Sequence, residues 1–167
     1  MKWKNYLIGI AGLLFLLGFD QLTKSLAVTH LKNKEAFPII KDVFELEYLE
    51  NHGAAFGMFQ NQRVFLLLFT IVILGLVVFF FLKLPFEKRY LPLRFAGILV
   101  GAGAVGNMID RMLLGYVVDF LYFKLINFPI FNVADCYVVI AAFFSFFLVC
   151  FYYKDEDFEF LKKKKGR

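Results

Sequence analysis

The chain has 167 residues, of which 60% are hydrophobic and 24 are phenylalanine, and its formal net charge is +5. The hydrophobic residues occur in long runs. This excludes an ordinary soluble domain, in which about 45–50% of residues are apolar, and indicates a polytopic membrane protein. Much of the positive charge lies in the terminal sequence KKKKGR, beside an apolar run, so we expect contact with membrane lipids and no nucleic-acid partner.

Four apolar segments are long enough to cross a bilayer. The first resembles a secretory signal peptide, but its apolar run is too long and no small-x-small cleavage site follows, so we expect a retained helix. The sequence therefore predicts an all-α membrane protein, a four-transmembrane-helix bundle that forms a single integral membrane domain over 1–167. The expected helices are about 6–28, 64–82, 93–114 and 133–153, and the two longer loops are about 29–63 and 115–132.

The first long loop contains a pattern of period two. Phe44, Leu46 and Tyr48 alternate with Glu45 and Glu47, which predicts a strand with one apolar and one wet face. The segment 36–40 is a candidate partner strand. We therefore expect a small extracytoplasmic β element in this loop.

Charged and amide side chains interrupt two of the apolar segments near one end. Asp20 and Lys24 lie on one face of the first, and Asn107, Asp110 and Arg111 lie on one face of the third. A charged residue at the centre of a transmembrane helix costs about 2.5–3.5 kcal/mol. One interpretation is structural. Asp20 would neutralise Lys24, whose amine reaches toward the lipid headgroups, and an Asp110–Arg111 pair would anchor its helix end. The other interpretation is a functional site.

Two further carboxylates flank the second long loop. Asp119 lies among Val117, Val118 and Phe120, and if it is buried there its pKa should be raised. Asp135 falls in the first turn of the fourth segment, where the helix dipole alone could account for a carboxylate. Both residues are candidates for the same site.

Lysine and arginine residues are concentrated at the two ends of the chain and in the short turn at 83–91, whereas the 115–132 loop has only Lys124. The first long loop also contains Lys32, Lys34 and Lys41, but acidic residues offset them. The positive-inside rule then places both termini in the cytoplasm and both longer loops outside. With this topology all the polar residues named above fall at the extracytoplasmic face. Unrelated structural roles would not need to share one side, so we predict a single site there.

The residue types limit the chemistry of this site. Ser145 is expected in the middle of a helix with no base near it in the sequence. Ser25 is next to Lys24, but neighbouring side chains on a helix point about 100° apart, which does not support a Ser–Lys pair. The two cysteines have no histidine near them, and roughly 21 Å of helix separates them, so they cannot form a disulfide. No HExxH motif is present, and we expect no metal and no cofactor. The carboxylates Asp119 and Asp135 remain, and two carboxyl groups that share a proton can act as acid and base on an amide.

Five sequence blocks carry a family resemblance. They are Asp20-Gln21-Leu22-Thr23-Lys24, Asn51-His52-Gly53-Ala54-Ala55-Phe56, Gly106-Asn107-Met108-Ile109-Asp110-Arg111, Val117-Val118-Asp119-Phe120 and Phe131-Asn132-Val133-Ala134-Asp135. In content and order they resemble the blocks of signal peptidase II, the lipoprotein signal peptidases. The resemblance extends from the first predicted helix to the fourth.

The resemblance implies an aspartyl endopeptidase of the bacterial inner (plasma) membrane, and we expect it to be a monomer. Its partners would be prolipoproteins whose cysteine bears diacylglycerol, cleaved just before that cysteine. Asp119 and Asp135 would be catalytic. The residues implied to bind substrate or shape the site are Asp20, Lys24, Asn51, Gly53, Asn107, Asp110, Arg111, Asn132 and Ala134. Cys136 departs from the small residue, such as serine, that we expect after the second aspartate.

Two other functions use similar residues. A small proton-coupled transporter also has intramembrane acids and a buried lysine, although acids gathered at one face do not form a path across the membrane. A non-catalytic assembly factor would use the charges as structural ion pairs. Asn substitutions of Asp119 or Asp135 would separate these functions from a protease.

Overall fold

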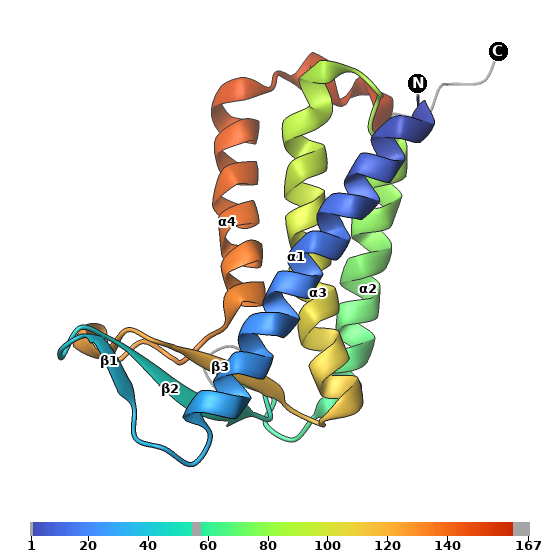
Figure 1. Cartoon of the computed structure of the whole chain (residues 1–167). Helices are drawn as coiled ribbons and strands as arrows, with labels where there is room; N and C mark the ends of the chain where they lie inside the picture. Colours follow the sequence, from blue (N-terminus) through green and yellow to red (C-terminus); the bar gives the residue numbers. More distant parts are fainter. Residues whose placement is uncertain (1, 55–57, 162–167) are drawn as a thin grey trace.

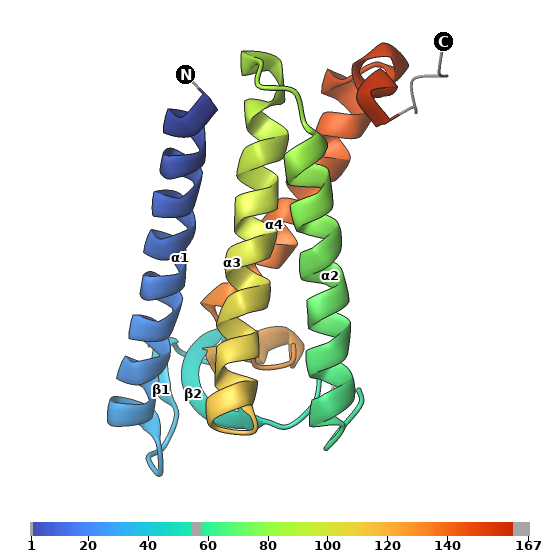
Figure 2. The same cartoon turned by 90° about the vertical axis from the view of Figure 1, so that its right-hand side faces the viewer.

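The structure is a computed structural model that describes residues 2–54 and 58–161. Within these residues four helices are long and apolar enough to cross a membrane, which confirms the predicted helical membrane fold. Figures 1 and 2 show the four helices side by side, with α3 between α1 and α2 in the second view. They are α1 (Lys2–Leu31), α2 (Arg63–Lys83), α3 (Leu91–Leu113) and α4 (Val133–Phe147), and the π-helical turn η4 (Leu148–Tyr152) continues α4.

Helix α3 is central to the bundle because its small residues let the other helices approach closely. It contacts α1, α2 and α4. Gly101, Ala102, Gly103 and Gly106 are all buried along it. A side-chain carbon at Gly106 would lie 2.5 Å from the Asp20 carboxylate, so α1 and α3 could not meet as they do without this glycine.

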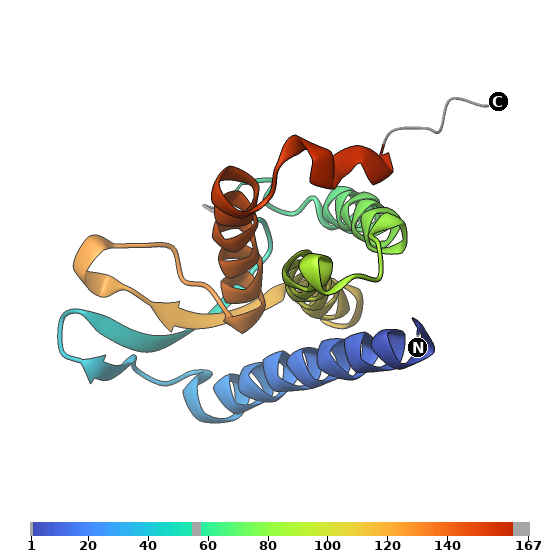
Figure 3. The same ribbon diagram turned by 90° about the horizontal axis from the view of Figure 1, so that it is seen from above.

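A three-stranded antiparallel sheet lies at one end of the bundle in the described part of the chain. Figures 1 and 3 show it reaching sideways beyond the helices. The predicted strand and its partner in the first loop are confirmed. The sequence did not predict the third strand, which comes from the second loop. The strands, in sheet order, are β1 (Phe37–Ile40), β2 (Phe44–Asn51) and β3 (Val117–Tyr122).

One face of β2 differs from the prediction. Glu45 was expected on a wet face, but it is buried and accepts a 2.9 Å hydrogen bond from Lys124 Nζ. Lys124 follows β3, and Glu45 pairs with Tyr122 in the β2–β3 register. The third strand therefore covers a residue that the alternating pattern assigned to solvent.

The opposite end of the bundle carries the first turns of α1 and the last turns of α4 (Figure 1). There the 3-10 helix η5 (Asp155–Leu161) folds back onto η2 (Lys88–Tyr90). Arg89 and Asp157 form a two-pronged ion pair, and Tyr90 donates to the Asp157 carbonyl at 2.8 Å. This end is thus closed by a contact far from the sheet and from the candidate site.

Candidate active site

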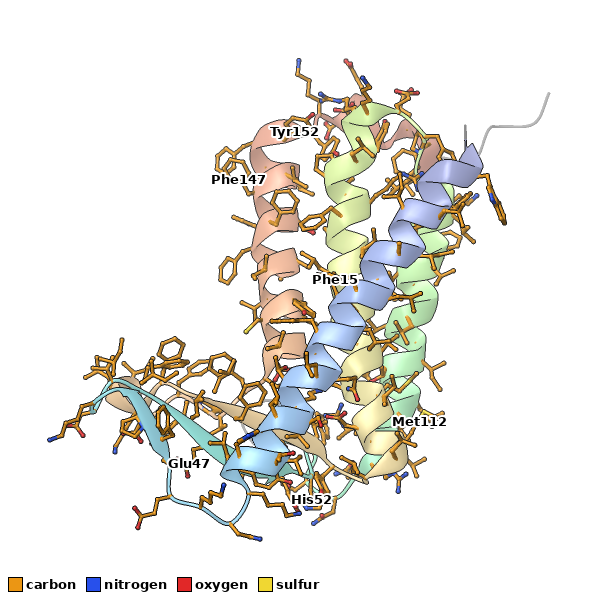
Figure 4. All side chains as sticks on the ribbon, in the orientation of Figure 1. Phe15, Glu47, His52, Met112, Phe147 and Tyr152 are labelled. Atoms are coloured by element: carbon orange, nitrogen blue, oxygen red, sulfur yellow. The ribbon has the colours of Figure 1, made fainter. Side chains whose placement is uncertain are left out.

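The polar residues predicted for the site converge where α1, α3, β3 and α4 meet, at the sheet end of the bundle. Figure 4 labels His52 and Met112 near this end, and Phe147 and Tyr152 toward the other. The side chains of Asp20 and Asn132 are completely buried, and Asp119 is 1% exposed. The structure therefore brings together residues that lie more than a hundred positions apart in the sequence.

Asp135 is fixed by the start of α4. Asn132 is the N-cap residue, and its Oδ1 accepts a 3.0 Å hydrogen bond from the Asp135 backbone N–H. In return, Asp135 Oδ2 accepts a 3.2 Å hydrogen bond from the Asn132 N–H. This reciprocal capping box satisfies two backbone donors that the helix itself leaves free, so the Asp135 side chain also stabilises the helix start.

Asp119 lies on β3 and receives one amide donor on each carboxylate oxygen. Asn132 Nδ2 donates to Oδ1 at 2.6 Å, and Asn51 Nδ2 donates to Oδ2 at 2.8 Å. Burial, with the negative charge of Asp135 as the second cause, raises the pKa of Asp119 to about 7. The two amide donors oppose this shift. Asp119 can therefore hold or release a proton near neutral pH.

A cluster of buried charges lies beside the two carboxylates. Lys24 Nζ is 3.0 Å from Asp20 Oδ2 and 2.9 Å from Asp110 Oδ2, and it donates to Asn107 Oδ1 at 2.8 Å. Asp20 Oδ1 in turn accepts a 2.9 Å hydrogen bond from the Ala134 N–H at the start of α4. The cluster thus connects α1, α3 and α4.

This arrangement corrects two structural interpretations of the sequence. Lys24 does pair with Asp20, but its side chain is 3% exposed and turns inward, so it does not reach for the headgroups. Asp110 pairs with Lys24 on another helix instead of with its neighbour Arg111. Gln21 was missed as a member of the cluster, although its Nε2 donates to Asp110 Oδ1 at 3.0 Å. Its position between Asp20 and Lys24 in the sequence could have indicated that it belongs to the cluster.

Arg111 instead holds the chain that follows β2. Its Nη2 donates to the Gly53 carbonyl at 2.8 Å, and the Gly53 N–H donates to Asn51 Oδ1 at 2.9 Å. A side-chain carbon at Gly53 would lie 2.6 Å from the Met58 carbonyl oxygen, so this turn requires a glycine. Arg111 and Gly53 thereby orient Asn51 toward Asp119.

Asp119 and Asp135 both line a cavity of about 850 Å³. Its other polar lining residues are Glu50, Asn51, Gln60, Asn107 and Arg111. The rest of the wall is mostly apolar. Apolar grooves for acyl chains and a signal helix were expected beside the site, but the residues that form this wall were not predicted from the sequence. The wall comes from the segment between β3 and α4 and from one side of α4, and it includes Phe123, Ile126, Phe128, Ile130, Phe131, Val138, Val139 and Ile140. Among the described residues no three His, Cys, Asp or Glu side chains are grouped to hold a metal ion. Asp119 and Asp135, with the amides of Asn51 and Asn107, therefore lie at the edge of an apolar space.

Known proteins resemble this chain in sequence and in fold. The family described as Signal peptidase (SPase) II matches residues 12–151. A lipoprotein signal peptidase of Caldanaerobacter subterraneus subsp. tengcongensis is 42% identical over 138 residues, covering 82% of this chain and 92% of that protein. One from Clostridioides difficile is 41% identical over 140 residues, covering 84% and 93%. A bacterial membrane enzyme solved by the in meso method at 2.3 Å has a TM-score of 0.76 and 32% identity, covering 96% of this chain and 94% of that one. The chain therefore belongs to the signal peptidase II family of bacterial multi-pass membrane proteases.

Proposed function

We propose that this protease removes the signal peptide from diacylglyceryl-modified prolipoproteins by cutting the peptide bond just before the lipidated cysteine, with Asp119 and Asp135 as its catalytic pair. The names of its relatives support the substrate class. The observation that carries the catalytic assignment is that both carboxylates line one cavity and share Asn132 as a hydrogen-bond partner.

The proposed mechanism uses the singly protonated pair. Asp135 as carboxylate takes a proton from a water molecule, whose oxygen attacks the scissile carbonyl carbon, while protonated Asp119 donates to the carbonyl oxygen. As the resulting tetrahedral diol collapses and the C–N bond breaks, Asp135 gives the proton it took from water to the leaving nitrogen, and Asp119 takes a proton back from a hydroxyl of the diol. The products are a signal peptide with a new carboxyl terminus and a lipoprotein whose cysteine has a free amine. The raised pKa of Asp119, about 7, supports its assignment as the acid.

The remaining residues would support this chemistry. The amides of Asn51, Asn107 and Asn132 hold the carboxylates, and Arg111 with Gly53 holds Asn51. Asp20, Lys24, Asp110 and Ala134 would fix the helices behind them. The apolar wall of the cavity fits a signal helix and acyl chains, which approach from the membrane.

Activity and catalytic assignment can be tested together. Purified protein in detergent, incubated with a diacylglyceryl-modified prolipoprotein, should release the signal peptide as a mass shift. Asp119→Asn and Asp135→Asn should keep their thermal unfolding midpoints but lose cleavage. The control is Asp42→Asn. Asp42 is an exposed carboxylate in the turn before β2, so this variant should cleave the substrate normally. No cleavage by folded wild type would favour the transporter, and cleavage by both Asn variants would refute the catalytic pair.

We further propose that both ends of the chain are cytoplasmic, that the site faces outward, and that the enzyme works as a monomer. The distribution of lysine and arginine supports this orientation. In a background without native cysteines, Asp42→Cys should react with an impermeant maleimide on intact spheroplasts, and Lys88→Cys should react only after lysis. The reverse pattern would overturn the orientation. The molar mass of the protein in detergent, measured by light scattering, should be that of one chain.

A further inference from the structure

Three asparagines surround the two carboxylates, and each has its amide oxygen bound by a group that can only donate. The Gly53 N–H binds Asn51 Oδ1 at 2.9 Å, and the Asp135 N–H binds Asn132 Oδ1 at 3.0 Å. Lys24 Nζ binds Asn107 Oδ1 at 2.8 Å. Because backbone N–H and ammonium groups have no acceptor, each amide has one permitted orientation, with its Nδ2 facing a carboxylate.

Asn107 differs from the other two in what orients it. The donors to Asn51 and Asn132 are backbone groups within three positions in the sequence, which come with the local turn and the helix cap. The donor to Asn107 is a side chain on another helix, 83 positions away. Asn132 Nδ2 also reaches Asn107 Oδ1, at the longer distance of 3.1 Å. Charge-assisted hydrogen bonds are shorter and roughly twice as strong as neutral ones, so the ammonium is the stronger constraint.

We infer that Lys24 is a positioning residue for the reaction, because its ammonium fixes the Asn107 amide so that Nδ2 donates to Asp135 Oδ1. That hydrogen bond measures 2.8 Å. The inference rests on the proposed function, in which Asp135 acts as the base. It assigns to the buried Asp20–Lys24–Asp110 cluster a role in the chemistry as well as in helix packing.

The geometry of the ammonium explains why a lysine serves here. Its three N–H donors face three acceptors, one each on Asp20, Asp110 and Asn107, at 3.0, 2.9 and 2.8 Å. The two carboxylates thus aim the third donor at the amide oxygen. Without this donor the amide can turn over, and its oxygen then faces Asp135 Oδ1. Two facing acceptors are tolerated only if Asp135 takes up a proton, which removes the base.

The competing explanation is that Lys24 only balances the charge of two buried acids. Lys24→Met alone does not separate the two explanations, because it leaves Asp20 and Asp110 uncompensated and endangers the fold. Lys24→Met combined with Asp110→Asn keeps the formal charge of the three residues at its original value. This double variant removes the donor to Asn107 and keeps the net charge of wild type. The Asp110→Asn single variant shows what the loss of the Asp110 carboxylate costs by itself. Because the single and the double variant differ by one charge, the same step is also measured in an Asn107→Ala background, where the charge change remains but the amide is absent.

The experiment measures kcat and KM for a diacylglyceryl-modified prolipoprotein, with the thermal midpoint as the folding control. We expect the double variant to have a kcat lower than that of Asp110→Asn by about tenfold or more, with KM and midpoint unchanged. In an Asn107→Ala background the same step from Asp110→Asn to the double variant should cost nothing further. Equal kcat in the double and the single variant, or an equal loss with and without Asn107, would overturn the inference. If the double variant does not fold, Lys24→Leu with Asp110→Asn, which also has no side-chain donor at position 24, replaces it under the same criteria.

The outcomes also separate this inference from the proposed function. If wild type fails to cleave the substrate, the proposed function fails first. If wild type cleaves, Asp119→Asn and Asp135→Asn do not, and the double variant matches Asp110→Asn, then the aspartic mechanism stands and only the role of Lys24 is refuted.

Discussion

The contact between α3 and the start of α4 leads to a quantitative prediction at Gly103. A side-chain carbon there would lie 2.5 Å from the Ala134 carbonyl oxygen and 2.7 Å from Val138 Cγ2. The first distance is about 0.9 Å shorter than the 3.4 Å at which ordinary contact begins. Gly103→Ala must therefore push the first turn of α4 away from α3 by most of an ångström.

This displacement acts on the geometry of the proposed catalytic pair. Asp135 directly follows Ala134 and moves with the first turn of α4, whereas Asp119 is held on β3 by strand pairing and by Asn51. A misplacement of about 1 Å in a catalytic group costs about 10²-fold in rate. We therefore expect Gly103→Ala to lower kcat by roughly two orders of magnitude.

Gly97→Ala is the matched control on the same helix. The nearest atom to a side-chain carbon at Gly97 is Phe81 Cδ2 at 3.5 Å, an ordinary contact distance. Both substitutions gain the same helix propensity, about 0.8–1.0 kcal/mol, so the difference between them isolates the contact with α4. The assay is cleavage of a lipidated prolipoprotein, with the thermal midpoint measured in parallel. Gly103→Ala with near-normal kcat, or Gly97→Ala equally impaired, would refute the reasoning.

Three more predictions follow from the same geometry. Because Asp119 is proposed to act in its protonated form and has a pKa of about 7, kcat/KM should fall as the pH rises through that value; a profile that stays level between about pH 6 and about pH 9 would contradict this. Cys136 lines the cavity and Cys150 is exposed. A maleimide should therefore inhibit cleavage by wild type and by Cys150→Ser, but not by Cys136→Ser. Equal inhibition of Cys136→Ser would show that modification of the cavity is not the cause. Asn132→Ala removes the N-cap of α4 and a donor to Asp119, so the free energy of unfolding should fall by about 1–2 kcal/mol and cleavage should be lost; unchanged stability in a thermal or denaturant titration would exclude the capping role.

Long-range pairing explains why β3 was not predicted. The four helices follow from runs of apolar residues, and β2 follows from alternation, both of which are local signals. In β3, Val117, Val118, Asp119 and Phe120 are all buried, so no alternation between a wet and a dry side marks the strand. Its partner is β2, which lies some seventy positions earlier, and a period within β3 carries no information about that pairing. The same strand explains the burial of Glu45.

The charge pairs show the same limit. Spacing along one helix correctly predicted that Asp20 and Lys24 meet. It also suggested that Asp110 meets Arg111, but Asp110 forms its ion pair with Lys24 on α1. The sequence revealed that the polar residues share one end of the bundle. It could not reveal which of them bond, because that depends on how the helices are rotated against each other.

The balance of charge at the site bears on why Asp119 retains a proton. Among the residues that the structure describes, the four carboxylates of the site lie near two cations, Lys24 and Arg111, in a region with little access to water. The carboxylates are Asp20, Asp110, Asp119 and Asp135. Asp20 and Asp110 each contact the Lys24 ammonium directly, whereas the groups that donate to Asp119 are the neutral amides of Asn51 and Asn132. An amide stabilises a carboxylate less than an ammonium does, so a proton is held most readily where the partners are neutral. Burial is the main cause of the raised pKa of Asp119 and the charge of Asp135 is the second, and the neutral amides oppose the shift without cancelling it. These effects give the proposed pair one carboxylic acid near neutral pH.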